Sequence, residues 1–184
     1  MKSRLLLIGA ALAAATAIPA QAGVEADAFT AFKSTCGAGS YANAVAAADA
    51  AGWKPSQGKM AAAPGITVTE TASRQTTIGG STVVMIVSNG TAAGGRVAVL
   101  SCDLFADHSR SLSGLAETAQ AWTEVAPQTK EANEVAFRYA GPSGQRRSVA
   151  PAEVNTSLGG EGVTSLSLKQ NGAVTHFTLI NFRM

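Results

Sequence analysis

The dipeptide Asn171-Gly172 constrains the fold of this chain more than any other feature of its sequence. Apolar and polar residues alternate on both sides of it, over residues 163–170 and 173–182. Alternation with a period of two is typical of strands buried on one face, and Asn-Gly is the strongest short signal for a two-residue hairpin turn. The end of the chain is therefore expected to form an antiparallel β-hairpin.

The turn also predicts which side chains of the hairpin share a face. With Asn171-Gly172 at its centre, Gln170 pairs with Ala173, and Ser167 lies opposite His176. One face then carries the apolar side chains that are expected to point into the core, namely Leu166, Leu168, Phe177 and Leu179. The other face carries polar side chains, namely Ser165, Ser167, Lys169, His176 and Thr178.

Four further segments have the composition of β-strands. Residues 67–78 are β-branched but polar, as expected of an exposed edge strand, and Gly79-Gly80 predicts a turn into the apolar run 81–87. Residues 96–105 are a second apolar run, and residues 134–139 a shorter one. The intervening segments 54–65 and 89–95 contain proline or glycine and are expected to be loops.

Apolar residues at helical spacing predict helices over residues 24–36 and 111–123, and Pro151 suggests the start of a short helix over residues 151–158. Another helix is expected to begin after Ser40, a typical N-cap residue, and to end at Ala51. Gly52 then occupies the position of a left-handed residue that ends a helix, and Trp53 is the apolar residue that folds back on the last turn.

Strands in runs, with the helices grouped outside them, predict an α+β fold in which the N-terminal helices pack on an antiparallel sheet. Residues 23–184 are expected to form one domain, because about two thirds of the surface of an unfolded chain of this size is buried on folding. The signals are weakest over residues 124–162.

Residues 1–22 have the pattern of a secretory signal peptide. Lys2 and Arg4 precede an apolar run over residues 5–18, and Ala20-Gln21-Ala22 supplies the small residues of a cleavage site between Ala22 and Gly23. The apolar run has fourteen residues, whereas a membrane-spanning helix needs about 20. We therefore expect a periplasmic or secreted protein with no transmembrane segment after cleavage.

The formal charge of +2 belongs to this leader. Removal of residues 1–22 takes away two of the 14 basic residues and leaves 12 basic against 12 acidic residues. The remaining chain is formally neutral, and its one basic doublet, Arg146-Arg147, is interpreted as part of a solvated turn. A nucleic-acid partner is not expected, because it requires a broader basic surface and stacking aromatic groups.

The chain contains two cysteines, Cys36 and Cys102, which close a loop of 67 residues. An even number of cysteines in an exported protein favours a disulfide, which would attach the end of the first helix to the sheet. The alternative is a cysteine nucleophile beside His108, but an isolated thiol would oxidise in that compartment. Two cysteines are too few for a cysteine-rich zinc site.

Two clusters carry side chains with possible chemistry. Ser167 and His176 suggest a nucleophile and its base, but no carboxylate lies nearby in sequence to orient the imidazole ring. Asp103, Asp107 and His108 are residue types that bind metals, although a role in capping the following helix is favoured. No catalytic residue, cofactor or metal site is therefore assigned.

Three short motifs together resemble a group of uncharacterised small exported alphaproteobacterial proteins. They are a helix that ends at Cys36, the sequence Ala-Ala-Asp-Ala-Ala-Gly-Trp at residues 47–53, and a second cysteine, Cys102, on a strand that follows Gly94-Gly95-Arg96. The resemblance implies an α+β domain with a disulfide and a bacterial periplasmic or secreted location. It implies no catalytic residue.

The sequence favours a non-enzymatic domain that binds a periplasmic protein or a small ligand. The edge strand at residues 67–78 is a candidate surface for a partner strand. One alternative is a small hydrolase that uses Ser167 and His176, and another is a structural or envelope-stress protein without a ligand.

Overall fold

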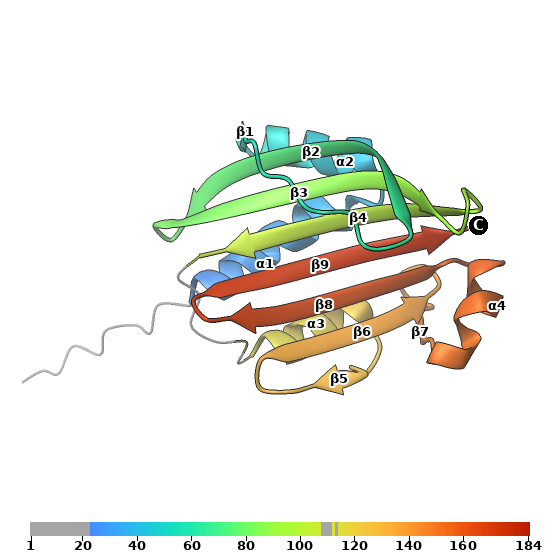
Figure 1. Ribbon diagram of the computed structural model, residues 1–184. Coiled ribbons are helices and arrows are strands. Elements are labelled where there is room, and N and C mark those ends of the chain that lie inside the picture. The colour runs from blue at the N-terminus through green and yellow to red at the C-terminus, as the bar shows by residue number, and fades with distance from the viewer. Residues whose placement is uncertain (1–22, 108–111, 113) are drawn as a thin grey trace, which may run out of the picture.

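The computed structural model describes residues 23–107, 112 and 114–184. Its centre is a nine-stranded antiparallel sheet, with the strand order β1-β2-β3-β4-β9-β8-β6-β5 and with β7 also paired to β6 (Figure 1). The predicted α+β class is therefore confirmed. The predicted signal peptide and His108 lie outside the described residues.

The strands are β1 (Lys54–Pro55), β2 (Ile66–Ile78), β3 (Ser81–Ala92), β4 (Val97–Ala106), β5 (Thr129–Lys130), β6 (Glu134–Ala140), β7 (Arg147–Ser148), β8 (Val163–Asn171) and β9 (Val174–Arg183). The α-helices are α1 (Val24–Thr35), α2 (Tyr41–Ala50), α3 (Leu115–Thr123) and α4 (Val154–Leu158), and two short 3-10 turns cover Cys36–Ala38 and Pro151–Glu153.

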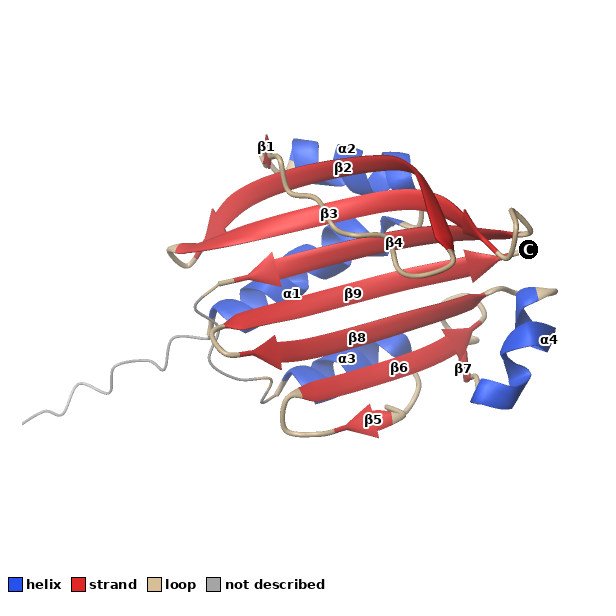
Figure 2. Cartoon of the chain, in the orientation of Figure 1, coloured by secondary structure: helices blue, strands red, loops and turns tan. Residues whose placement is uncertain are grey.

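One face of the sheet is covered by α1, α2 and α3, which lie behind it in Figure 2. Phe29 and Phe32 of α1 each place their ring centroid 5.6 Å from that of Phe177 on β9. Trp122 of α3 meets both phenylalanines edge to face, at 5.9 and 6.1 Å. Aromatic rings at these separations join the two helices and the centre of the sheet in one core.

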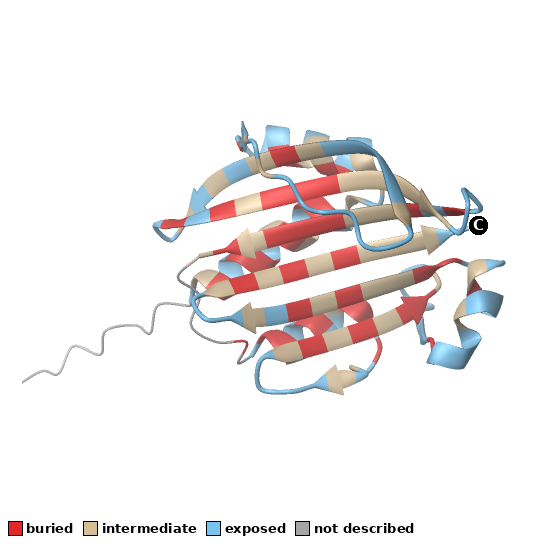
Figure 3. Ribbon diagram, in the orientation of Figure 1, coloured by how far each residue is buried: buried red, intermediate tan, exposed pale blue. Residues whose placement is uncertain are grey.

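Buried and less buried residues alternate along the strands, as Figure 3 shows. The side chains that face the helices include Val83, Met85, Val87, Leu104, Phe137, Leu166, Leu168, Phe177 and Leu179, each at most 4% exposed. The predicted core face of the C-terminal hairpin is therefore confirmed. We call the opposite side of the sheet, which α1–α3 leave uncovered, the open face.

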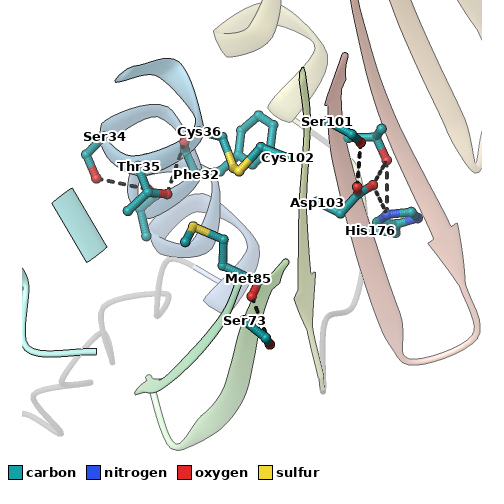
Figure 4. Close-up of a disulfide and its surroundings, with 12 residues drawn as sticks. Phe32, Ser34, Thr35, Cys36, Ser73, Met85, Ser101, Cys102, Asp103 and His176 are labelled. Carbon is teal, nitrogen blue, oxygen red and sulfur yellow. Dashed lines mark hydrogen bonds and ion pairs between the residues drawn. A yellow bond between two sulfur atoms is a disulfide. The ribbon is translucent and has the colours of Figure 1, made fainter. Parts of the chain in front are cut away.

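The disulfide predicted from the sequence is present between Cys36 and Cys102, with their Cα atoms 5.4 Å apart. It joins the turn after α1 to the middle of β4, and both cysteines are 1% exposed (Figure 4). The helical layer is thus attached covalently to a central strand.

The start and end of α2 also agree with the sequence. The Ser40 hydroxyl accepts a hydrogen bond from the backbone N–H of Asn43, and Gly52 has a φ of 79°. The helix is joined to β2 by Arg74, whose Nε donates to Asp49 at 2.6 Å. This hydrogen bond holds the pKa of the Asp49 carboxyl below its usual range.

The register of the C-terminal hairpin differs from the predicted one. Asn171 pairs with Val174, so Gly172 and Ala173 are the central turn residues and Ser167 lies opposite Thr178 instead of His176. Gly172 has a φ of 60°, and glycine with positive φ at the first central position is typical of a type II′ turn. The register therefore changes by two residues, which leaves every side chain on its predicted face.

Three predicted boundaries were wrong. Lys54 and Pro55 form a short strand beside β2 instead of a loop, and β3 continues through residues 89–92, where a loop was expected. The third helix begins at Leu115 and not at Ser111, because Gly114 has a left-handed φ of 79° that no α-helix accommodates. Ser111 itself is outside the described residues.

The extension of β3 depends on Gly90, which lies opposite Val68. A Cβ atom at Gly90 would be 2.5 Å from the carbonyl oxygen of Thr67. Glycine is therefore needed here so that the two backbones can approach each other, and a residue typical of loops occupies a strand.

No helix of the described residues is long and apolar enough to span a membrane.

We expect replacement of both cysteines by alanine to lower the free energy of unfolding by about 4 kcal/mol, because the closed loop no longer restricts the unfolded chain. Urea denaturation of the oxidised protein and of the Cys36→Ala/Cys102→Ala double variant measures the difference. An unchanged transition midpoint would contradict the assignment of the disulfide as a structural link.

We expect Gly90→Ala to destabilise the protein by about 1–3 kcal/mol, because the new methyl group collides with the β2 backbone. Gly160→Ala is the matched control, since a Cβ atom there meets nothing within 4 Å. Thermal unfolding of both variants tests this difference. Equal stabilities would show that the close approach at Gly90 is not important.

Candidate functional site

The candidate site lies on the open face of the sheet, where β4 and β9 pair. Asp103 follows Cys102 in β4, and successive residues of a strand point to opposite faces. Figure 4 shows this directly, because the Cys102 side chain points to α1 while Asp103 points away from it toward His176. Asp103 is only 1% exposed although it lies on the open face.

Three side chains donate hydrogen bonds to the Asp103 carboxylate. Oδ1 accepts from His176 Nε2 at 2.9 Å and from Thr178 Oγ1 at 2.8 Å, and Oδ2 accepts from Ser101 Oγ at 2.8 Å. The register supplies this arrangement, since Asp103 pairs with Thr178 and Phe105 pairs with His176. Hydrogen bonds to a carboxylate are stronger than those between neutral groups, so the cluster is held firmly.

The hydrogen bonds assign the tautomer of His176. The Thr178 hydroxyl gives its hydrogen to Asp103, and its oxygen lies 3.0 Å from His176 Nε2. Both neighbours of Nε2 are therefore acceptors, so Nε2 carries a hydrogen and Nδ1 is the acceptor nitrogen of the neutral ring. The ring stacks on Phe105 with centroids 4.2 Å apart, which fixes its plane.

A chain segment crosses the open face near this cluster. Residues 56–65 connect β1 to β2 and pass in front of the sheet in Figure 1, and most of them are exposed in Figure 3. The segment is attached at its start, where the backbone N–H of Ser56 donates to the Ser73 carbonyl at 3.1 Å and the two hydroxyls are 2.5 Å apart. We call residues 56–65 the crossing segment.

A cavity of about 210 Å³ lies between the crossing segment and the sheet. Ser101, Asp103, His176 and Thr178 form its polar end. The apolar lining comes from both the crossing segment and the sheet, and includes Met60, Ala61, Ala62, Ala63, Ile66, Val68, Val99 and Ile180. A mainly apolar cavity with a few convergent polar groups is the usual form of a small-molecule site.

A bulge in β2 brings part of the apolar lining into place. The pairing with β3 shifts between Val68 and Glu70, so Thr69 is an extra residue without a direct partner. An extra residue reverses the alternation of faces beyond it. Ile66 and Val68 therefore face the cavity, on the same side of the sheet as Thr71 and Ser73 farther along the strand.

Ser167 and His176 lie on the same face, as predicted, but they do not form a nucleophile and base. His176 is hydrogen-bonded to Asp103 and Thr178, and the buried Ser167 Oγ has no hydrogen-bond partner in the structure. A buried hydroxyl that does not contact the base lacks the geometry for nucleophilic attack.

The partner of His176 is not predictable from its neighbours in the sequence. Asp103 is 73 residues away, and the sequence favours a helix-capping role for it together with Asp107 and His108, whereas it lies within β4 and is buried. One signal in the sequence does point to its position. Asp103 follows a cysteine in an apolar strand, so if the cysteine faces the core, the carboxylate lies on the opposite face of the sheet. Among the described residues no group of three potential ligands could hold a metal ion.

Comparisons with protein-family models, with curated proteins and with solved structures gave no match for this chain.

We expect Asp103→Ala to lower the free energy of unfolding by about 3 kcal/mol, because three donors lose their acceptor in a buried position. Asp107→Ala is the control, since Asp107 lies just after the same strand and is not buried; a change below about 0.5 kcal/mol is expected there. Chemical denaturation measures both values. A neutral effect of Asp103→Ala would show that the cluster does not contribute to stability.

Proposed function

We propose that the protein is an exported, non-enzymatic binding domain that holds a small molecule in the cavity beneath the crossing segment. The observation that carries this proposal is the position of Asp103, a buried carboxylate in a mainly apolar cavity whose other polar lining residues are Ser88, Asn89, Ser101, His176 and Thr178. Buried ionisable groups are costly to keep, and they are concentrated at functional sites.

The size of the cavity limits the ligand. An apolar protein cavity of about 150 Å³ accommodates benzene. A cavity of about 210 Å³ therefore suits a molecule somewhat larger than one benzene ring. Larger metabolites and nucleotides do not fit unless the crossing segment moves away from the sheet.

The residues around the cavity support reversible entry of a ligand. Met60 is 42% exposed and Val68 is 39% exposed, and both line the cavity. Large apolar side chains that remain exposed beside a cavity gain free energy when a ligand covers them. The crossing segment also supplies a wall that is not part of the hydrogen-bonded sheet.

The proposal of a non-enzymatic role rests on the bonding within the cluster. The Ser101 and Thr178 hydroxyls both donate to Asp103, so neither donates its hydrogen to His176 as a nucleophile does to its base. The export proposal rests on the predicted signal peptide, and the Cys36–Cys102 disulfide supports it because such bonds persist in oxidising compartments. A periplasmic or secreted location in a bacterium agrees with the resemblance described above.

A screen of small apolar fragments tests the proposal. We expect bound fragments to raise the melting temperature and to shift the backbone amide resonances of Ser101, Asp103 and Thr178. Ala62→Trp should abolish both effects because the indole fills the cavity. Ala121→Trp, at an exposed position of α3, is the matched control and should bind like the original protein.

If no fragment shifts these resonances, the binding proposal is wrong and a structural or envelope-stress role without a ligand is favoured. Shifts that persist unchanged in Ala62→Trp would place the binding site elsewhere on the protein.

A further inference from the structure

Among the residues that the structure describes, no lysine or arginine contacts the Asp103 carboxylate. The carboxylate contacts His176 Nε2, which carries a hydrogen in both the neutral and the charged ring. This hydrogen bond therefore does not require a positive charge on His176. The other two donors are the neutral hydroxyls of Ser101 and Thr178. Buried charges are normally paired, and here hydrogen bonds alone account for the contacts.

The Asp103 carboxylate also retains a place for one more donor. A carboxylate has about four acceptor positions, two on each oxygen. Oδ1 accepts two hydrogen bonds, from His176 and Thr178, whereas Oδ2 accepts one, from Ser101. With respect to the described residues, one position on Oδ2 is therefore left, and Asp103 is among the residues that line the cavity.

The lining of the cavity determines which head group suits that position. Its described residues include no lysine and no arginine, so a carboxylate or phosphate on the ligand would meet the negative charge of Asp103 without a compensating cation from them. A cation with several N–H donors, in contrast, would balance the charge and use the remaining acceptor position. Asp103 is 1% exposed, and attraction between opposite charges is stronger at a buried position than in bulk water.

The apolar part of the ligand has a defined direction. Val99 and Asp103 lie four residues apart on β4, which corresponds to about 13 Å along a strand. Ile180 pairs with Ser101 between these two positions, and Ile66 and Val68 add to the apolar lining. A short, narrow apolar chain can therefore extend along β4 from a head group placed at Asp103.

We infer that the cavity selects a primary ammonium group on a short apolar chain, with the ammonium against Asp103 Oδ2 and the chain directed to Val99. This inference rests on the proposed binding function and specifies the class of ligand. It distinguishes small amines from alcohols and carboxylic acids of the same length.

Three probes of equal length test the inference on the disulfide-bonded protein: n-hexylamine, n-hexanol and n-hexanoate. Titrations followed by amide resonances give the three dissociation constants. We expect hexylamine to bind at least about tenfold more tightly than hexanol, because its hydrogen bond is charge-assisted. Hexanoate should bind more weakly than either.

Asp103→Asn keeps the shape of the side chain and removes its charge. We expect the preference for hexylamine over hexanol to fall to about twofold or less in this variant. Asp107→Asn is the matched control, because the same change is made outside the cavity, and it should keep the full preference. Ser101→Ala frees a second acceptor position on Oδ2 and should strengthen amine binding, which provides a second test if Asp103→Asn fails to fold.

The outcomes separate this inference from the proposal on which it rests. If hexanol or hexanoate binds in the cavity at least as tightly as hexylamine, the ligand class is wrong but the binding function stands. A preference for hexylamine over hexanol that stays at about tenfold in Asp103→Asn, or amine binding that is not strengthened in Ser101→Ala, also overturns the inference. If none of the three probes binds, the proposed function itself is contradicted.

Discussion

The pairing of β4 with β9 is the interaction on which both faces of the sheet depend. It sets Cys102 opposite Leu179 and Asp103 opposite Thr178, so the same two strands supply the centre of the core and the polar end of the cavity. A slip of one residue between them would exchange these faces. Phe29 and Phe32 of α1 pack on Phe177 of β9, and Trp122 of α3 packs on these two phenylalanines. This packing strongly favours the observed register.

The parts of the fold that could be predicted are those that local patterns determine. Alternation predicts Leu166 and Phe177 on the core face correctly, although the expected strand pairing differs by two residues from the observed one. A shift of two residues leaves every side chain on the same face. Ser40 and Gly52 marked the ends of α2 because capping depends on neighbouring residues in the chain. The two cysteines are predicted to pair because an even number of cysteines in an exported protein favours a disulfide.

The cavity was not predictable in the same way, because it depends on contacts between distant segments. Asp103 and His176 are far apart in the chain and meet only when β9 joins β4. The apolar lining requires the bulge at Thr69, which reverses the alternation in β2, and it requires the crossing segment to pass over the open face. Gly90 is a related case. Glycine is typical of loops, so the sequence predicts a loop there, whereas the residue lies in a strand and allows two backbones to approach each other.

The adjacency of Cys102 and Asp103 has a consequence for the precision of the site. One peptide bond separates a residue that is covalently linked to the turn after α1 from the carboxylate that organises the open face. The packing of the core therefore fixes the position of the carboxylate, although the crossing segment that forms part of the cavity wall is mostly exposed. A ligand that enters from solvent meets a group whose orientation is set before it arrives, so little ordering entropy is lost at that contact on binding.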